Sequence, residues 1–96
     1  MNKLQIIESI KTDRLYLQEH FGVQEIALFG SYARGEEKIG SDIDILVSLE
    51  KPSYSILMEL YIYLEKKLHS KIDIVRKGPH VSERFLKHIN KDLIYV

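Results

Sequence analysis

The sequence contains no cysteine, carries no net charge and has no long hydrophobic run. Without cysteine, disulfides and thiolate metal sites are excluded. The 14 basic residues balance 14 acidic ones, so we expect no strong nonspecific binding to nucleic acid, which needs a net basic surface. No apolar stretch approaches the roughly 20 residues of a membrane span, and the first residues lack the apolar core of a signal peptide. We therefore expect a cytoplasmic protein.

The chain has 96 residues, which is enough for one hydrophobic core, so we expect a single domain over residues 1–96. Apolar residues recur at helical spacing in some segments and form short strand-like runs in others. We expect helices over residues 3–20 and 31–36, after Ser53 and around Phe85, and strands over residues 23–29, 42–49 and 71–76. This alternation predicts an α/β (α+β) fold in which helices cover a small sheet. The last residues, Leu93–Val96, fit either an edge strand or a tail that docks on a partner.

Gly30 and Ser31 follow a predicted strand and precede a short predicted helix. Such a position gathers free backbone N–H groups at the positive end of a helix dipole, which suits a phosphate. Gly30 lets the backbone approach closely, and Ser31 adds a hydroxyl donor. A plain helix cap explains the same pair, because serine is a preferred N-cap residue and glycine is common in turns. The segment does not resemble a P-loop, because no Gly-Lys-Ser/Thr follows.

Asp42 and Asp44 lie two residues apart in a predicted strand, so their carboxylates leave the same face of it. The neighbouring Ile43 and Ile45 point to the other face. Two like charges side by side in a sheet repel, and a divalent cation such as Mg²⁺ or Mn²⁺ removes that penalty. A solvated strand start explains Asp42 well, but it explains Asp44 poorly, because Asp44 is flanked by apolar residues.

Asp73 is another acid inside an apolar run, Ile72-Asp73-Ile74-Val75. If its strand lies beside residues 42–49, three carboxylates can converge. Two metal ions would offset their repulsion and could clamp the attacking and leaving oxygens of an in-line displacement. Asp73 could also act as a general base on an acceptor hydroxyl. The alternative is an edge strand that turns Asp73 toward water.

Arg34 stands one turn into the short helix predicted after Gly30 and Ser31. Its guanidinium could meet a phosphate or an acceptor molecule. A solvated helix position and an ion pair with Glu36 or Glu37 are equal alternatives. The residues alone leave these roles open.

Taken together, these motifs resemble those of the minimal nucleotidyltransferases, which belong to the DNA polymerase β-like superfamily. The resemblance rests on Gly30-Ser31-x-Ala33-Arg34-Gly35, on Ser41-Asp42-x-Asp44 about ten residues later, and on Asp73 in its Ile-Asp-Ile-Val strand. It covers residues 23–96, nearly the whole chain, and the combined motif is specific although its parts are not. It implies the polymerase β palm-like nucleotidyltransferase fold, built on a small mixed sheet flanked by helices.

The resemblance also implies a role for each motif residue. Gly30 and Ser31 hold the triphosphate of ATP, with Arg34 as a further nucleotide-binding residue. Asp42 and Asp44 bind Mg²⁺, two ions in all, and Asp73 completes the carboxylate set.

Many relatives are antitoxins encoded beside a HEPN-domain ribonuclease toxin, which they neutralise by binding it and by transferring AMP from ATP onto a toxin tyrosine. The resemblance therefore implies an Mg²⁺-dependent adenylyltransferase that acts on a HEPN partner, in a homo- or hetero-oligomer. One alternative is nucleotidyl transfer to a small molecule or an RNA end, with a second subunit completing the site. Another is a non-catalytic module that neutralises a toxin by occlusion, although occlusion does not need the three acids.

Overall fold

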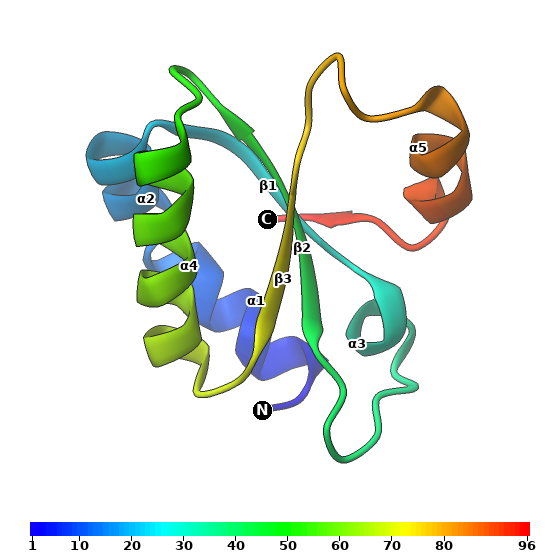
Figure 1. Ribbon diagram of the computed structural model, residues 1–96. Coiled ribbons are helices and arrows are strands. Elements are labelled where there is room, and N and C mark those ends of the chain that lie inside the picture. Colours follow the sequence, from blue (N-terminus) through cyan, green and yellow to red (C-terminus); the bar gives the residue numbers. More distant parts are fainter.

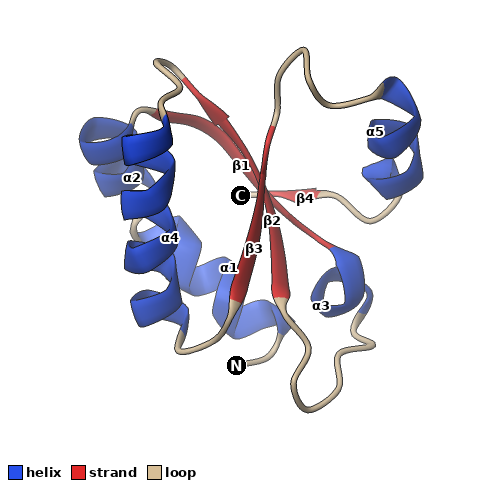
Figure 2. Ribbon diagram, viewed as in Figure 1, coloured by secondary structure: helices blue, strands red, loops and turns tan.

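The computed structural model describes all residues, 1–96, and contains one four-stranded sheet with helices on both sides (Figure 1). The helices are α1 (Lys3–Thr12), α2 (Arg14–Phe21), α3 (Gly30–Arg34), α4 (Tyr54–Leu68) and α5 (Glu83–Asn90). The strands are β1 (Val23–Phe29), β2 (Ile43–Leu49), β3 (Ile72–Arg76) and β4 (Ile94–Tyr95). Helices α1, α2 and α4 cover one face of the sheet, and α5 covers part of the other (Figure 2). None of the helices has the length and apolar character that crossing a membrane requires.

The sheet combines parallel and antiparallel pairs in the order β3-β2-β1-β4. Strand β2 runs antiparallel to β1 and parallel to β3, and β4 pairs with β1 antiparallel at the other edge. Helix α4 forms the crossover between β2 and β3, because parallel strands cannot be joined by a tight turn. The predicted small mixed sheet flanked by helices is confirmed, and the end of the chain forms an edge strand.

The strands lie close to their predicted ranges. Strand β1 spans the predicted residues, while β2 and β3 each begin one residue later than predicted. Helix α4 begins directly after Ser53, whose hydroxyl accepts a hydrogen bond from the Ile56 N–H at 3.1 Å. This N-cap explains why the helix starts there, since the bond satisfies one of the four free N–H groups of the first turn.

The prediction of one helix over residues 3–20 is wrong. The chain forms α1 and α2 with a break at Asp13, whose backbone adopts φ −95° and ψ 5°. The Asp13 carboxylate accepts a hydrogen bond from the Tyr63 hydroxyl of α4 at 2.5 Å and lies 3.4 Å from the Lys67 ammonium. Burial and this hydrogen bond raise the pKa of Tyr63 to about 12. Contacts with a helix fifty residues away therefore fix the break, which local spacing did not reveal.

The two faces of the sheet have cores of different size. On the face toward α1, α2 and α4, Ile43 and Ile45 are fully buried in the main core, as the alternation in β2 predicts. On the other face, a small cluster joins Phe29 and Leu46 to Ile89 of α5. This cluster is small and does not include a residue from the start of β2. Polar side chains occupy that part of the face.

Arg14 ties the end of the chain to the start of β1. From the start of α2, its guanidinium donates to the carbonyl oxygens of Val96 at 3.2 Å, Val23 at 3.3 Å and Gln24 at 2.6 Å. These carbonyls belong to the last residue of the chain and to the start of β1. One side chain therefore holds the C-terminus beside β1.

We predict that Arg14→Lys lowers the free energy of unfolding by about 1–3 kcal/mol, because a single ammonium cannot serve three carbonyls in different directions. Urea unfolding monitored by circular dichroism measures the loss. The matched control is Arg84→Lys, which changes an exposed arginine of α5 and should stay within about 0.5 kcal/mol of the unmodified chain. Equal losses in the two variants would show that Arg14 does not hold the C-terminus.

Candidate functional site

The acids of the predicted site lie at the end of the sheet where β2 and β3 begin. Asp44 and Asp73 are register partners across the parallel pair, so their side chains leave the same face next to one another. Asp44 is half-buried, and Asp73 is exposed on β3, which is an edge strand. Asp42 precedes the first residue of β2 and is exposed. The two strands thus lie side by side, as convergence of the acids requires.

Gly30 lies directly against the Asp44 carboxylate. A Cβ atom at Gly30 would stand 2.9 Å from Asp44 Cγ and closer still to a carboxylate oxygen. Gly30 also adopts φ +76°, a left-handed conformation that residues with a side chain rarely adopt. The backbone and the available space therefore both require glycine where β1 turns into α3.

The negative charges of Asp42 and Asp73 repel the Asp44 carboxylate. Burial raises the pKa of Asp44, and the nearby charges of Asp73 and Asp42 raise it further. The Arg34 charge acts in the opposite direction and is the weakest of these influences. Asp44 is therefore held in an environment that disfavours its ionised form unless a positive charge comes close.

The chemistry of this donor set fits a hard divalent cation. Carboxylate oxygens are the ligands that Mg²⁺ and Mn²⁺ prefer, and a cation would relieve the repulsion around Asp44. The side chains do not already converge as ligands, since no group of three or more His, Asp or Glu residues in the chain has the geometry of a metal site. Because Asp42 and Asp73 are exposed, their side chains are free to rotate toward Asp44.

Ser31 does not cap α3, so the plain-cap explanation of this residue is wrong. The N-cap position falls on Phe29, which makes no side-chain cap hydrogen bond. Ser31 lies inside the helix and is half-buried. Its hydroxyl is therefore available to a ligand next to Gly30 and Asp44.

Arg34 forms two ion pairs on the exposed side of α3. Its Nε lies 2.8 Å from a Glu36 carboxylate oxygen, and its Nη1 lies 2.8 Å from a carboxylate oxygen of Asp92. Hydrogen bonds to Glu36 and Asp92 raise the pKa of Arg34. The pairing with Glu36 was one of the alternatives open in the sequence. The pairing with Asp92 was not predicted, because a contact between residues 58 positions apart leaves no local signal.

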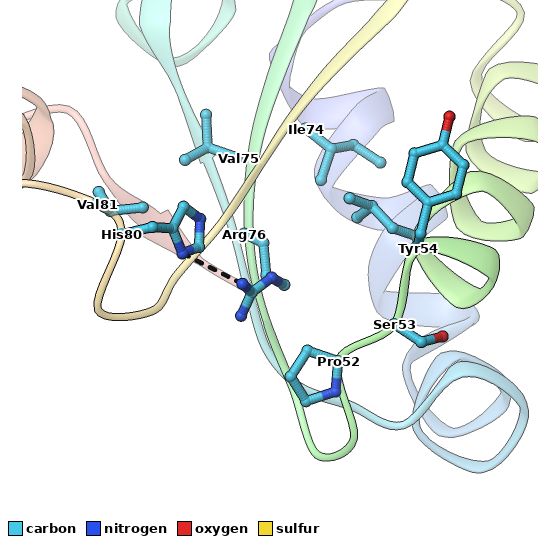
Figure 3. A pocket seen from close by; sticks show the side chains of 9 residues that line it. Pro52, Ser53, Tyr54, Ile74, Val75, Arg76, His80 and Val81 are labelled. Atoms are coloured by element: carbon cyan, nitrogen blue, oxygen red, sulfur yellow. Dashed lines mark hydrogen bonds between the residues drawn. The ribbon is translucent and has the colours of Figure 1, made fainter.

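The largest cavity of the chain lies away from these acids. It has a volume of about 610 Å³ and is lined by residues from the start of α4, the end of β3 and the loop that follows. Figure 3 shows Arg76 and His80 joined by a hydrogen bond at its side, with Tyr54 across from them. Since Asp44 and Asp73 stand at the beginnings of their strands and Arg76 at the end of β3, the cavity and the acids occupy opposite ends of the sheet.

Comparison with known proteins gives the site a context. Residues 10–96 match the family described as "Nucleotidyltransferase domain". The protein adenylyltransferase MntA of Thermococcus cleftensis is 44% identical over 98 residues, which cover 100% of this chain and 98% of the relative.

Two solved structures share the fold. One, described as a candidate minimal nucleotidyltransferase, superposes with a TM-score of 0.80 at 27% identity and covers 98% of this chain and 95% of its own. The other is a complex of tri-AMPylated HEPN toxin of Shewanella oneidensis with MNT antitoxin. It has a TM-score of 0.64 at 25% identity and covers 95% of this chain and 70% of its own. With the family match over nearly the whole chain, these similarities show that the chain belongs to the nucleotidyltransferase domain family.

Proposed function

We propose that this protein transfers AMP from ATP to a partner protein in an Mg²⁺-dependent reaction, and that it serves as an antitoxin which AMPylates a HEPN ribonuclease toxin. The proposal rests on the register pairing of Asp44 with Asp73 and on the close contact between Gly30 and the Asp44 carboxylate. The 44% identity to a protein adenylyltransferase over the full chain supports the protein acceptor, as does the AMPylated toxin bound to an MNT antitoxin of similar fold.

In the proposed reaction, the acceptor hydroxyl attacks the α-phosphorus of ATP. A bond forms between that oxygen and AMP, the bond from the α-phosphorus to the bridging oxygen breaks, and pyrophosphate leaves. Asp73, which is exposed, would take the proton of the hydroxyl. Mg²⁺ held by Asp42 and Asp44, with Asp73 completing the set, would neutralise the charge of the triphosphate.

The nucleotide would lie against the start of α3. Gly30 brings the start of α3 against the Asp44 carboxylate and the metal that it would hold, and Ser31 would donate its hydroxyl to the triphosphate. Arg34 already uses Nε for Glu36 and Nη1 for Asp92, so its Nη2 would be the nitrogen that meets a phosphate. A zero net charge argues against a polyanionic acceptor, which a basic surface would have to hold.

Intact-mass spectrometry tests this function. With ATP, Mg²⁺ and the protein encoded beside this chain, we predict that the neighbour gains roughly 329 Da for each AMP added. Asp44→Asn should slow the transfer at least about a hundredfold, because loss of a metal ligand removes several kcal/mol of transition-state stabilisation. The control Glu19→Gln removes one charge from α2 on the other face of the sheet and should retain the rate of the unmodified protein.

The same experiment separates the alternatives. Label that appears on tRNA or on a small molecule, with the neighbour unmodified, would reject the protein acceptor and retain nucleotidyl transfer. Neutralisation of a toxin by both the unmodified protein and Asp44→Asn, without any added mass, would leave only occlusion.

Gly30→Ala tests the packing between α3 and Asp44. We predict that it lowers the free energy of unfolding by more than about 1 kcal/mol and also abolishes AMP transfer, because the new Cβ displaces the Asp44 carboxylate. Gly35→Ala is a matched control, since Gly35 has a similar φ of +70° but nothing within 4 Å of an added Cβ. It should show the backbone penalty of about 1 kcal/mol and keep the transfer rate. Loss of transfer in both variants would contradict a specific role for Gly30.

The raised pKa of Asp44 predicts a pH-dependent stability in the absence of metal. The folded chain holds the Asp44 proton more tightly than the unfolded chain, so this contribution is full below the ordinary pKa of 3.8 and is lost as the pH rises through the raised value. At neutral pH in excess chelator, Asp44→Asn should therefore melt at a higher temperature than the unmodified protein. Added Mg²⁺ should stabilise only the unmodified protein. A lower melting temperature of the variant in chelator would assign Asp44 a structural role instead.

A further inference from the structure

Two carboxylates of different mobility hold the Arg34 guanidinium, each at an N···O distance of 2.8 Å. Glu36 lies just after α3, and its side chain is 66% exposed. Asp92 lies in the turn between α5 and β4, and its side chain is 12% exposed. The Asp92 N–H also donates to the Ile89 carbonyl oxygen at 2.9 Å, which fixes the backbone of that turn. Asp92 is therefore held in place by the fold, whereas Glu36 can leave Arg34 at little cost because water replaces it.

The two carboxylates also bind different edges of the guanidinium. Glu36 accepts a hydrogen bond from Nε, and Asp92 accepts one from Nη1. In a guanidinium, Nε and Nη2 donate in parallel along one edge, while Nη1 lies on the far side of the group. Arginine commonly binds a phosphate through two such parallel N–H groups. Glu36 thus takes one of the two donors that a phosphate would use, and Asp92 takes neither.

The Arg34 guanidinium lies near the acids of the site. Arg34 ends the short helix whose first residue, Gly30, contacts Asp44. Residues four apart lie on the same side of a helix, and their side chains lean toward its start. Burial and the charges of Asp73 and Asp42 raise the pKa of Asp44, and the Arg34 charge opposes them. Arg34 therefore stands within electrostatic reach of Asp44 and of a triphosphate beside it.

We propose that Glu36 occupies the place of a phosphate on Arg34 in the free chain, and that Asp92 positions the guanidinium for the nucleotide. This inference rests on the proposed function, because it concerns the same nucleotide site. When ATP binds, one phosphate oxygen accepts from Nη2 and a second replaces the Glu36 carboxylate at Nε. Asp92 stays at Nη1 and keeps the side chain from turning into solvent. Glu36 thus competes with the nucleotide, and Asp92 assists its binding.

Titration calorimetry of the full chain with Mg²⁺ and α,β-methylene ATP, which cannot transfer AMP, tests these opposite roles. Glu36→Gln should lower the dissociation constant about threefold, because the competing carboxylate is gone. Asp92→Asn should raise it about threefold to tenfold, although it too removes a negative charge, because Arg34 loses its fixed partner. The control Glu25→Gln removes the same charge from a pair with Lys77 at the other end of the sheet. It should stay within about twofold of the unmodified chain.

Thermal unfolding without nucleotide separates positioning from a purely structural role. Glu36→Gln and Asp92→Asn each remove one ion pair of Arg34, so neither variant should melt at a higher temperature than the unmodified chain. A structural role would therefore move the affinity for the nucleotide in the same direction in both variants. Shifts of the same sign would overturn the proposal.

Both effects should depend on Arg34. In an Arg34→Gln chain, adding Glu36→Gln or Asp92→Asn should change the dissociation constant by less than about twofold. The full shifts in that background would overturn the inference. Because binding is measured without an acceptor, these shifts in a chain that transfers AMP to no protein would reject the protein acceptor and support the inference. Binding that needs Asp44 but not Arg34 would support the proposed metal site and overturn the inference.

Discussion

The close contact between the Asp44 carboxylate and Gly30 is the constraint on which the rest of the site depends. It brings the turn from β1 into α3 against the start of β2, and it is possible only because residue 30 has no side chain. The parallel register then sets Asp73 beside Asp44. The glycine turn and a pair of acids thus meet at one end of the sheet, an arrangement that suits the nucleotide transfer we propose.

Holding these acids together has an energetic cost, and the fold offsets it on the other face of the sheet. Burial, and then repulsion from Asp73 and Asp42, raise the pKa of Asp44, while Ile43 and Ile45 on either side of it are fully buried in the main core. Because neighbouring side chains of a strand point to opposite faces, residues 43–45 can both fill the core and present an acid on the other face. The core residues keep the acid in place even though its charge disfavours the position.

The sequence predicted those features that depend on local pattern. An aspartate among isoleucines at Asp44, and the glycine-serine pair after an apolar strand, predicted the candidate site, and the apolar runs predicted strands that the structure contains. Features that depend on distant partners were missed. The break at Asp13 comes from contacts with Tyr63 and Lys67 of α4, and Arg34 pairs with Asp92 from the other end of the chain. Residues so far apart in the sequence show no spacing pattern, because only the folded chain brings them together.

Locating the bound metal tests the proposed transferase site most directly. In NMR spectra of the labelled chain with a non-hydrolysable ATP analogue, Mn²⁺ broadens the signals of nearby amides. We predict that the amides of Gly30, Asp44 and Asp73 broaden first, and that those of Tyr54 and Arg76 at the other end of the sheet stay sharp. Broadening centred elsewhere, or none at the starts of β2 and β3, would contradict a metal-dependent transferase site at Asp44.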